Sequence, residues 1–272
     1  MNDMSRYLFA IVLAMAVLFG WQIIFPPEQR EIINNEIIEQ QDNIQLSVSP
    51  EDVQNYSEPC QEDRVLIQSN KITGSINLCG AKIDEIFLKD FKTSTREDSD
   101  FVQFFNPKDS GNAYWVESGW KAPKNIRYDL PGTDTLWVLE EGQTLTPDTP
   151  VIISWNNQNG LTFKQKISID ENYVFKFEQT IINNSPGSIT VFPFQQLSRK
   201  EAPDVQALGL LHEGPTGYFD DQLEEVDYDD IEENDFRSEF KDGWVGIRDK
   251  YWATAITSLD KDTKRAIFKT SS

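Results

Sequence analysis

The sequence predicts an all-β fold, a large antiparallel β-sandwich, preceded by one N-terminal transmembrane helix. From Arg64 onward, short runs rich in β-branched and aromatic residues alternate between apolar and polar positions, as strands with one buried face do. Turn signals separate these runs, and no amphipathic helix of three turns stands out among them. Many short strands at this spacing are typical of an antiparallel sandwich.

The predicted strands and turns alternate along this region. The strand pattern is found in residues 64–70, 72–79, 81–88, 151–155, 161–170, 173–182 and 188–194. Turn signals lie at residues 130–134, 157–160, 169–173 and 183–187. No internal repeat is present in the sequence. The region therefore reads as a single sandwich and not as an array of repeated units.

Two neighbouring runs predict a β-hairpin. One face of the first run holds Leu161, Phe163, Gln165, Ile167 and Ile169. Its other face holds the polar set Thr162, Lys164, Lys166 and Ser168, which indicates a strand with one solvated face. The second run repeats the pattern with Tyr173, Phe175 and Phe177. Because the turn between the runs is short, we expect the two strands to pair.

An apolar stretch from Tyr7 to Phe25 predicts the transmembrane helix. It is 19 residues long and contains only Gln22 as a strongly polar residue. At about 1.5 Å per residue, this length matches a hydrocarbon core of roughly 30 Å. A cleaved signal peptide would have a shorter apolar region and a small-residue cleavage site. We therefore favour an uncleaved anchor that contacts the lipid bilayer through residues 7–25.

The flanking charges predict the orientation of this helix. Arg6 and the terminal amine precede it, and a net acidic segment follows it, which places the N-terminus in the cytoplasm. The next residues are rich in Glu, Gln and Asn and have too little apolar content to fold alone. The predicted organisation is an anchor at residues 1–27, a polar flexible linker at 28–60 and an extracytoplasmic β-sandwich domain at 61–272.

Composition excludes several classes of function. The formal net charge is −20, and no basic patch interrupts it, so nucleic acid is not an expected partner. His212 is the only histidine, which rules out sites that need two imidazoles. The sequence has no GxSxG or GxxxxGK[ST] motif. We predict no enzyme activity, no catalytic residue, no cofactor-binding residue and no metal ligand.

The two cysteines, Cys60 and Cys79, fit no zinc-binding pattern. In an oxidising compartment a disulfide between them is an open alternative. The favoured interpretation is a buried thiol at Cys79 and an exposed thiol at Cys60, because Cys60 lies in a polar segment.

Residues 220–235 hold ten acids and no base. Their order does not match a Ca²⁺-binding loop, since a loop that starts at Asp227 has Ile231 at its fifth position and Glu232 at its sixth, where glycine is required. The favoured interpretation is a solvated acidic excursion. The alternative is docking onto the sandwich through its apolar side chains, Leu223, Val226, Tyr228 and Ile231.

Residues 241–256, "KDGWVGIRDKYWATAI", combine aromatic and charged residues, as ligand-binding surfaces do. Their alternation instead predicts two neighbouring strands with Asp249 and Lys250 at the bend. Trp244 and Trp252 then become core or edge-covering residues. Close backbone approach is expected at the two glycines of the segment, Gly243 and Gly246.

Together these segments resemble the N-terminal part of the YidC membrane-protein insertases of Gram-negative bacteria. The run from Leu161 to Ser185 and the "GW…DKYW" motif are the most specific parts, and the segments follow one another in the same order as in the family. Beyond the N-terminal anchor, the resemblance is carried by residues 72–91, 113–120, 144–185, 210–228 and 242–256.

The resemblance implies a periplasmic supersandwich similar to sugar mutarotases, on a protein of the cell inner membrane. It implies partners as well: the Sec translocon including SecDF, and nascent inner-membrane proteins whose insertion, folding and assembly the family assists as insertase and chaperone. In the family, insertion activity lies in a later bundle of transmembrane helices, and none of that bundle's residues can be carried over to this sequence.

The sequence ends at Ser272 without a second apolar span after Phe25, so we interpret it as an N-terminal fragment, truncated before the insertase helices. We expect a sandwich that lacks its final strands to expose apolar surface and open strand edges. The alternative function is a membrane-anchored periplasmic carbohydrate- or peptide-binding module. An active mutarotase is not expected, because His212 beside Glu213 cannot supply the histidines that such a site uses.

Overall fold

The alternating runs form four β-sheets in residues 63–200 and 212–270, the parts of the chain that the computed structural model describes. These residues all belong to one compact unit, Leu46–Ser272. The predicted anchor and linker lie outside them. In the described ranges, no helix has both the length and the apolar character needed to cross a membrane.

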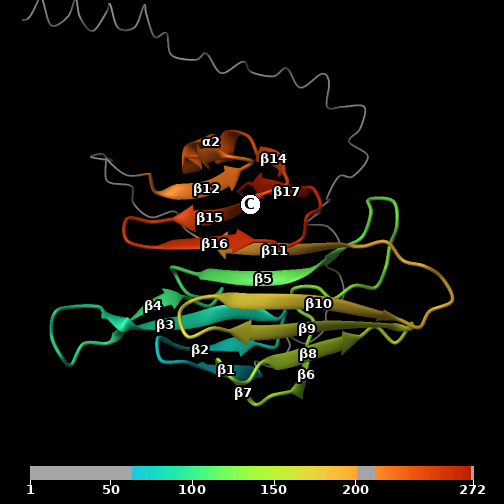
Figure 1. Cartoon of the computed structure of the whole chain (residues 1–272), viewed down its shortest axis with the longest axis horizontal. Helices are drawn as coiled ribbons and strands as arrows, with labels where there is room; N and C mark the ends of the chain where they lie inside the picture. Colours follow the sequence, from blue (N-terminus) through green and yellow to red (C-terminus); the bar gives the residue numbers. More distant parts are fainter. Residues whose placement is uncertain (1–62, 201–211, 271–272) are drawn as a thin grey trace, which may run out of the picture. The chain divides into compact units, whose positions relative to one another are not determined.

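The first two sheets make the sandwich (Figure 1). The large sheet has the order β11 (Phe192–Arg199), β5 (Tyr114–Lys121), β3 (Lys82–Lys92), β2 (Ile72–Asn77), β1 (Arg64–Gln68) and β7 (Thr144–Leu145), with β4 (Phe101–Phe105) also on β3. The hairpin sheet has the order β10 (Phe175–Asn183), β9 (Leu161–Ile169), β8 (Val151–Asn156) and β6 (Val138–Glu141). The strands pair antiparallel, except that β1 and β7 are parallel.

The other two sheets form a C-terminal module, which we define as residues 212–270. The C-terminal sheet has the order β13 (Gln222–Glu225), β12 (Gly214–Phe219), β15 (Gly243–Arg248) and β16 (Ala253–Thr257). A two-stranded sheet pairs β14 (Phe236–Phe240) with β17 (Lys264–Phe268). A single short helix, α2 (Tyr228–Glu233), precedes β14 within the described residues. The prediction of an all-β antiparallel fold is confirmed.

The main core lies between the large sheet and the hairpin sheet. The predicted apolar face of β9 is buried along its whole length, and Phe163 and Ile167 are fully inaccessible. The ring of Phe163 lies 5.1 Å from that of Trp120 on β5. Burial of this kind stabilises each large apolar side chain by about 1.5–3 kcal/mol. The predicted hairpin is also confirmed, since β9 and β10 pair antiparallel over nine residues each.

The C-terminal module has a second, smaller core. Its buried members are Phe219, Val226, Ile231, Phe240, Ala266 and Phe268. Two of them, Val226 and Ile231, come from the acidic segment 220–235. The interpretation of this segment as a wholly solvated excursion is therefore wrong. The segment folds as β13 and α2 and docks through three of its four apolar residues, Val226, Tyr228 and Ile231, while Leu223 remains 56% exposed.

The strand limits differ from the prediction at several places. The strand predicted at residues 188–194 begins only at Phe192 and continues to Arg199. The strand predicted to end at Leu88 continues to Lys92, where it pairs with β4. Alternation identified β1, β2, β3, β8, β9, β10, part of β11, and the pair β15 and β16. It did not mark β4, β5, β6, β12, β13, β14 or β17, nor the two-residue β7, whose position is fixed by pairing with a distant strand.

Cys79 is disulfide-bonded and only partly buried, which corrects the interpretation of a buried thiol. Cys79 lies in the turn between β2 and β3. The amide of the preceding Leu78 donates to the carbonyl of Asp63 at 2.9 Å. This bond brings the chain just before β1 beside Cys79. The sequence contains one other cysteine, Cys60, which lies outside the described residues.

Thiol titration in urea tests this correction on the unreduced full chain. We expect no reactive thiol before reduction and two after it. Because the bond closes a loop of about 20 residues, its reduction should lower the free energy of unfolding by about 3 kcal/mol. Two reactive thiols in freshly purified, unreduced protein would contradict this expectation.

Candidate functional site

Residues 241–256 form the junction between the C-terminal module and the sandwich. They fold as β15 and β16, and the amide of Asp249 donates to the carbonyl of Trp252 at 2.7 Å to close the connection. The predicted bend at Asp249 and Lys250 is therefore confirmed. This hairpin belongs to the C-terminal sheet, yet Ile247 and Trp252 pack against the main core.

Trp252 is a structural residue. Its ring meets the ring of Phe91 edge-on at 4.9 Å, and it lies 6.1 Å from the ring of Phe104. These two phenylalanines come from β3 and β4 of the large sheet. Aromatic pairs in this geometry contribute about 0.5–1.5 kcal/mol beyond the area they bury. The prediction that Trp252 covers core or edge is confirmed.

An ion pair at the same junction joins Arg199 of β11 to Asp249. The two guanidinium nitrogens of Arg199 lie 2.5 and 2.7 Å from the two carboxylate oxygens. The side chains are only 16% and 19% exposed. Arg199 also donates to the Tyr228 hydroxyl at 3.4 Å and lies 4.5 Å from the ring centre of Tyr114. One cation thus contacts the large sheet, the β15–β16 turn and α2.

The pKa directions at this junction follow from burial and pairing. Burial alone would lower the pKa of Arg199, but its hydrogen bonds to Asp249 and Tyr228 raise it overall. Burial also raises the pKa of the Tyr114 phenol well above its usual range. Arg199 therefore stays charged and Tyr114 stays neutral at ordinary pH. The arrangement is suited to holding two sheets together, and neither Arg199 nor Tyr114 is set to exchange a proton near neutrality.

The predicted close approach at Gly243 and Gly246 is also confirmed. Gly243 has a φ of +147°, and a Cβ atom there would lie 1.8 Å from the carbonyl oxygen of Tyr218. A Cβ at Gly246 would lie 2.0 Å from the carbonyl oxygen of Thr254. Both contacts are with backbone, which cannot rotate away.

Replacing Gly243 with alanine should therefore destabilise the C-terminal module. We expect the free energy of unfolding, measured by urea denaturation, to fall by about 1–3 kcal/mol because the backbone conformation becomes strained. Gly187→Ala is the matched control, since a Cβ there meets nothing within 4 Å. Equal stability of the two variants would contradict the close approach at β12.

A hollow of about 360 Å³ is lined by polar side chains and by the apolar Leu161 and Ile189. Asn157 organises it: its amide nitrogen donates to the carbonyl of Asp129 at 3.1 Å, and its oxygen accepts from the amides of Asn159 and Leu161. The Tyr128 hydroxyl accepts from the amide of Thr190 at 3.3 Å. The further lining residues are Arg127, Ser185, Gly187, Ser188 and Ile189.

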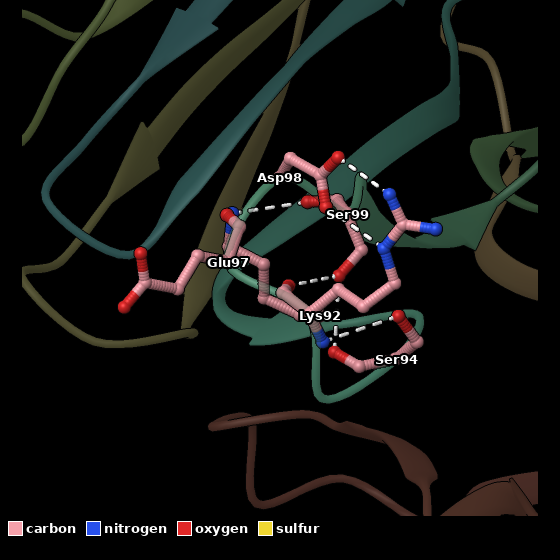
Figure 2. A network of polar contacts seen from close by, with 6 residues as sticks. Lys92, Ser94, Glu97, Asp98 and Ser99 are labelled. Carbon is pink, nitrogen blue, oxygen red and sulfur yellow. Dashed lines mark hydrogen bonds and ion pairs between the residues drawn. The ribbon is translucent and has the colours of Figure 1, made fainter.

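The loop between β3 and β4 is held by a local polar network, shown in Figure 2. The ammonium of Lys92 donates to the carbonyls of Glu97 and Ser99, each at 3.0 Å. Arg96 forms two hydrogen bonds to Asp98, at 3.0 and 2.7 Å. Every one of these partners lies within the loop, so the network orders the loop itself.

His212 has structural contacts. Its Nε2 lies 3.1 Å from the carbonyl oxygen of Pro215, and its Nδ1 lies 3.4 Å from Asp227. The imidazole therefore ties the start of β12 to the segment before α2. In residues 63–200 and 212–270, no group of three or more acidic, histidine or cysteine side chains is placed to hold a metal ion.

The fold and the junction define a β-sandwich domain with two cores, in which an ion pair and aromatic contacts hold a smaller module against the main one. A family model described as the YidC periplasmic domain matches residues 64–272. The chain belongs to this family.

Relatives with a common name are similar to this chain over most of its length. A protein named Membrane protein insertase YidC from Rickettsia bellii (strain OSU 85-389) is 36% identical over 264 residues, which cover 94% of this chain and 46% of the relative. The protein of that name from Rickettsia rickettsii (strain Iowa) is 34% identical over 265 residues, or 94% of this chain and 47% of the relative. The chain spans about half the length of these relatives.

Proposed function

We propose that this chain is the membrane-anchored periplasmic part of an insertase that assists the insertion, folding and assembly of inner-membrane proteins. The observation that carries the proposal is the family match over residues 64–272 together with the name of the relatives. The contacts described above are structural, which suits a domain that positions partners. We propose no catalytic, cofactor-binding or metal-ligating residue and no enzyme activity.

The proposed domain organisation is the one that the sequence predicts. Residues 1–27 anchor the chain in the inner membrane with the N-terminus in the cytoplasm, and residues 7–25 contact lipid. Residues 28–60 form a polar flexible linker, and residues 61–272 form a periplasmic domain of the mutarotase-like supersandwich type. The proposed partners are the Sec translocon including SecDF, and nascent inner-membrane proteins.

A chimaera tests this function directly. The matched region of the Rickettsia bellii relative is replaced by this chain, and insertion of a model inner-membrane protein is measured in membrane vesicles. We expect insertion within about twofold of that by the unmodified relative. A chimaera that is membrane-integrated and protease-resistant in its periplasmic domain, yet inactive, would contradict the proposal. A version lacking residues 63–270 reports how much the domain contributes.

The hollow beside Asn157 and Tyr128 favours a second candidate function, binding of a carbohydrate or peptide. Its lining includes Tyr128, Asn159 and Ser188, which offer an aromatic ring and polar side chains to a small ligand. Binding to a panel of oligosaccharides and short peptides can be followed by calorimetry. A ligand whose affinity is lost in Tyr128→Ala, with the fold intact, would support this candidate, and the absence of any ligand would remove it.

A further inference from the structure

Three connections between strands meet at one end of the sandwich, on the left of Figure 1: the β9–β10 turn, the β3–β4 loop and the β15–β16 turn. The hydroxyl of Tyr173, in the β9–β10 turn, donates to the carboxylate of Asp90 on β3 at 2.8 Å. The ring of Phe91, the next residue of β3, lies 4.9 Å from that of Trp252, which closes the β15–β16 turn. The three connections therefore form one continuous surface, although they are far apart in the sequence.

This surface presents large apolar side chains to solvent. The exposed set, which we call the apolar tips, consists of Phe91, Phe101, Tyr173, Val174 and Tyr251. Val174 is 63% exposed and Tyr251 is 76% exposed. Turns usually hold small polar residues, and the turns at the opposite end of β9 and β10, residues 157–160 and 183–188, do so. The apolar tips therefore depart from the usual chemistry of turns.

A lysine lies over the ring of three apolar tips. The ammonium nitrogen is 5.1, 5.2 and 5.3 Å from the ring centre in the pairs Lys71–Tyr173, Lys92–Phe101 and Lys250–Tyr251. Aromatic rings are enriched at the level of lipid headgroups, and lysine stems cover apolar surface there while the ammonium stays in the polar layer. The repeated pairing of ring and lysine therefore favours a lipid surface as the occupant of this end.

The charge of the chain decides which kind of lipid surface fits. Carboxylates beside the tips are paired within the domain: Asp90 lies 3.8 Å from Lys71, and Asp249 is held by Arg199. The formal net charge of the whole chain is nevertheless −20, which disfavours an anionic bilayer. A zwitterionic phospholipid offers phosphate groups to the lysines without a net negative charge, so it is the matching surface.

The tips are held in place by ordered turns. A carboxylate oxygen of Asp170 accepts from the amides of Asn172 and Val174 at 2.8 and 2.9 Å. In the β15–β16 turn, the amide of Asp249 donates to the carbonyl of Trp252 at 2.7 Å. Groups that are already ordered lose little conformational freedom when they bind. Contact with a bilayer would therefore retain most of the free energy gained by burying the tips.

The predicted linker is long enough to let this end reach the membrane. The chain enters β1 at Arg64, at the end opposite to the tips, because β1 runs toward Lys71. A flexible linker over residues 28–60 has a mean span of about 30 Å. The 11 residues of β3 span about 36 Å. Since the linker and the domain have similar lengths, either end can reach the bilayer, and the apolar tips select one of them.

We propose that the apolar tips rest in the headgroup layer of a zwitterionic phospholipid bilayer, so that the β3–β4, β9–β10 and β15–β16 connections face the membrane. The inference rests on the membrane anchor of the proposed function, which keeps the bilayer at a high effective concentration. With the surface tethered close by, a shallow contact by a few side chains is enough to orient the domain.

Fluorescence quenching by lipid tests the proposal on the full chain in nanodiscs of zwitterionic lipid. A fluorophore is attached at Val174→Cys or Tyr251→Cys, and Cys79 does not compete for the label because it is disulfide-bonded. Val138→Cys and Leu259→Cys are the matched control positions, 62% and 86% exposed and distant from the tips. A lipid with a quencher near its headgroup should reduce emission about twofold at the tips and by less than about 10% at the controls.

A label at a third position measures what the tips contribute. Thr95→Cys places the fluorophore in the β3–β4 loop, beside the tips. In this background, Val174→Ser/Tyr251→Ser should weaken quenching about threefold or more, because it removes apolar surface from the contact. The control Val138→Ser/Leu259→Ser should change quenching by less than about 10%. Replacing roughly a third of the lipid with an anionic phospholipid should weaken quenching at Thr95→Cys, because the chain is acidic.

Four outcomes would overturn the proposal. Equal quenching at the tips and at the control positions would mean that no end of the domain prefers the membrane. Unquenched tips on a chain that stays in the nanodisc would remove the contact and leave the proposed function standing. A chain that does not stay in the nanodisc would contradict the anchor, and with it both proposals. Loss of tip exposure only when a nanodisc holds two chains would show that a second copy covers the tips.

Thermal melting of each variant separates these outcomes from unfolding. The substituted positions are exposed, so the melting temperature should remain nearly unchanged.

Discussion

Replacing Phe163 with alanine is expected to lower the free energy of unfolding by about 3–5 kcal/mol. The side chain is fully buried, and its ring lies 5.1 Å from Trp120 and 5.9 Å from Trp155. The truncation removes apolar contacts and leaves a cavity between two sheets whose backbones cannot close over it. Urea denaturation of the full chain in mild detergent, followed by tryptophan fluorescence, measures the change.

Phe101→Ala is the matched control for this prediction. Phe101 is 37% exposed and lies under the ammonium of Lys92, so its truncation should cost less than about 1 kcal/mol. If the two variants lose equal stability, the main core does not lie where β5, β8 and β9 meet. Phe240→Ala, in the second core, shows whether the C-terminal module unfolds together with the sandwich.

Arg199→Ala is expected to cost about 3 kcal/mol, because it leaves the carboxylate of Asp249 largely buried without its cation. The same substitution removes the guanidinium from the Tyr228 hydroxyl and from the face of Tyr114. We therefore expect the C-terminal module to separate from the sandwich before the sandwich unfolds. Denaturation should change from one transition to two when followed by both fluorescence and circular dichroism.

The double variant Arg199→Met/Asp249→Leu makes the test specific. It removes both charges and keeps apolar volume at the junction, so it should recover much of the lost stability. Arg96→Ala is the control for an exposed pair, since Arg96 and Asp98 are 77% and 70% exposed, and it should cost less than about 1 kcal/mol. If Arg199→Ala is as mild as Arg96→Ala, the ion pair does not hold the module.

Local alternation predicted the parts of the fold that depend on local chemistry. The hairpin of β9 and β10 was identified from the spacing of Phe163, Ile167 and Phe175 and from a short turn. The order of the large sheet was not, because pairs such as β11 with β5 join residues far apart in the sequence. The periodicity of apolar residues does not indicate which strands far apart in the sequence will pair.

At the junction, too, features within one strand were predicted from the sequence, and contacts between distant residues were not. The glycines and Trp252 were assigned structural roles, since glycine and alternating aromatic residues have meaning within one strand. The pairing of Arg199 with Asp249 had no sequence signal, because the two residues are 50 positions apart and both read as ordinary surface charges. The disulfide at Cys79 was misjudged for the same reason, as its surroundings depend on where the chain before β1 returns.

Gln165 fixes the alignment of the two sandwich sheets. It is fully buried on the apolar face of β9, where its amide accepts from the hydroxyl of Ser118 at 2.7 Å and donates to the Ser118 carbonyl at 3.1 Å. Apolar side chains tolerate many relative positions of two sheets. An amide that is hydrogen-bonded to one residue allows a single relative position. Sliding one sheet past the other by one residue would leave two buried polar groups without hydrogen-bond partners. Gln165 therefore fixes how the two sheets are aligned. Without it the core would remain apolar, but the sheets could pack in more than one relative position.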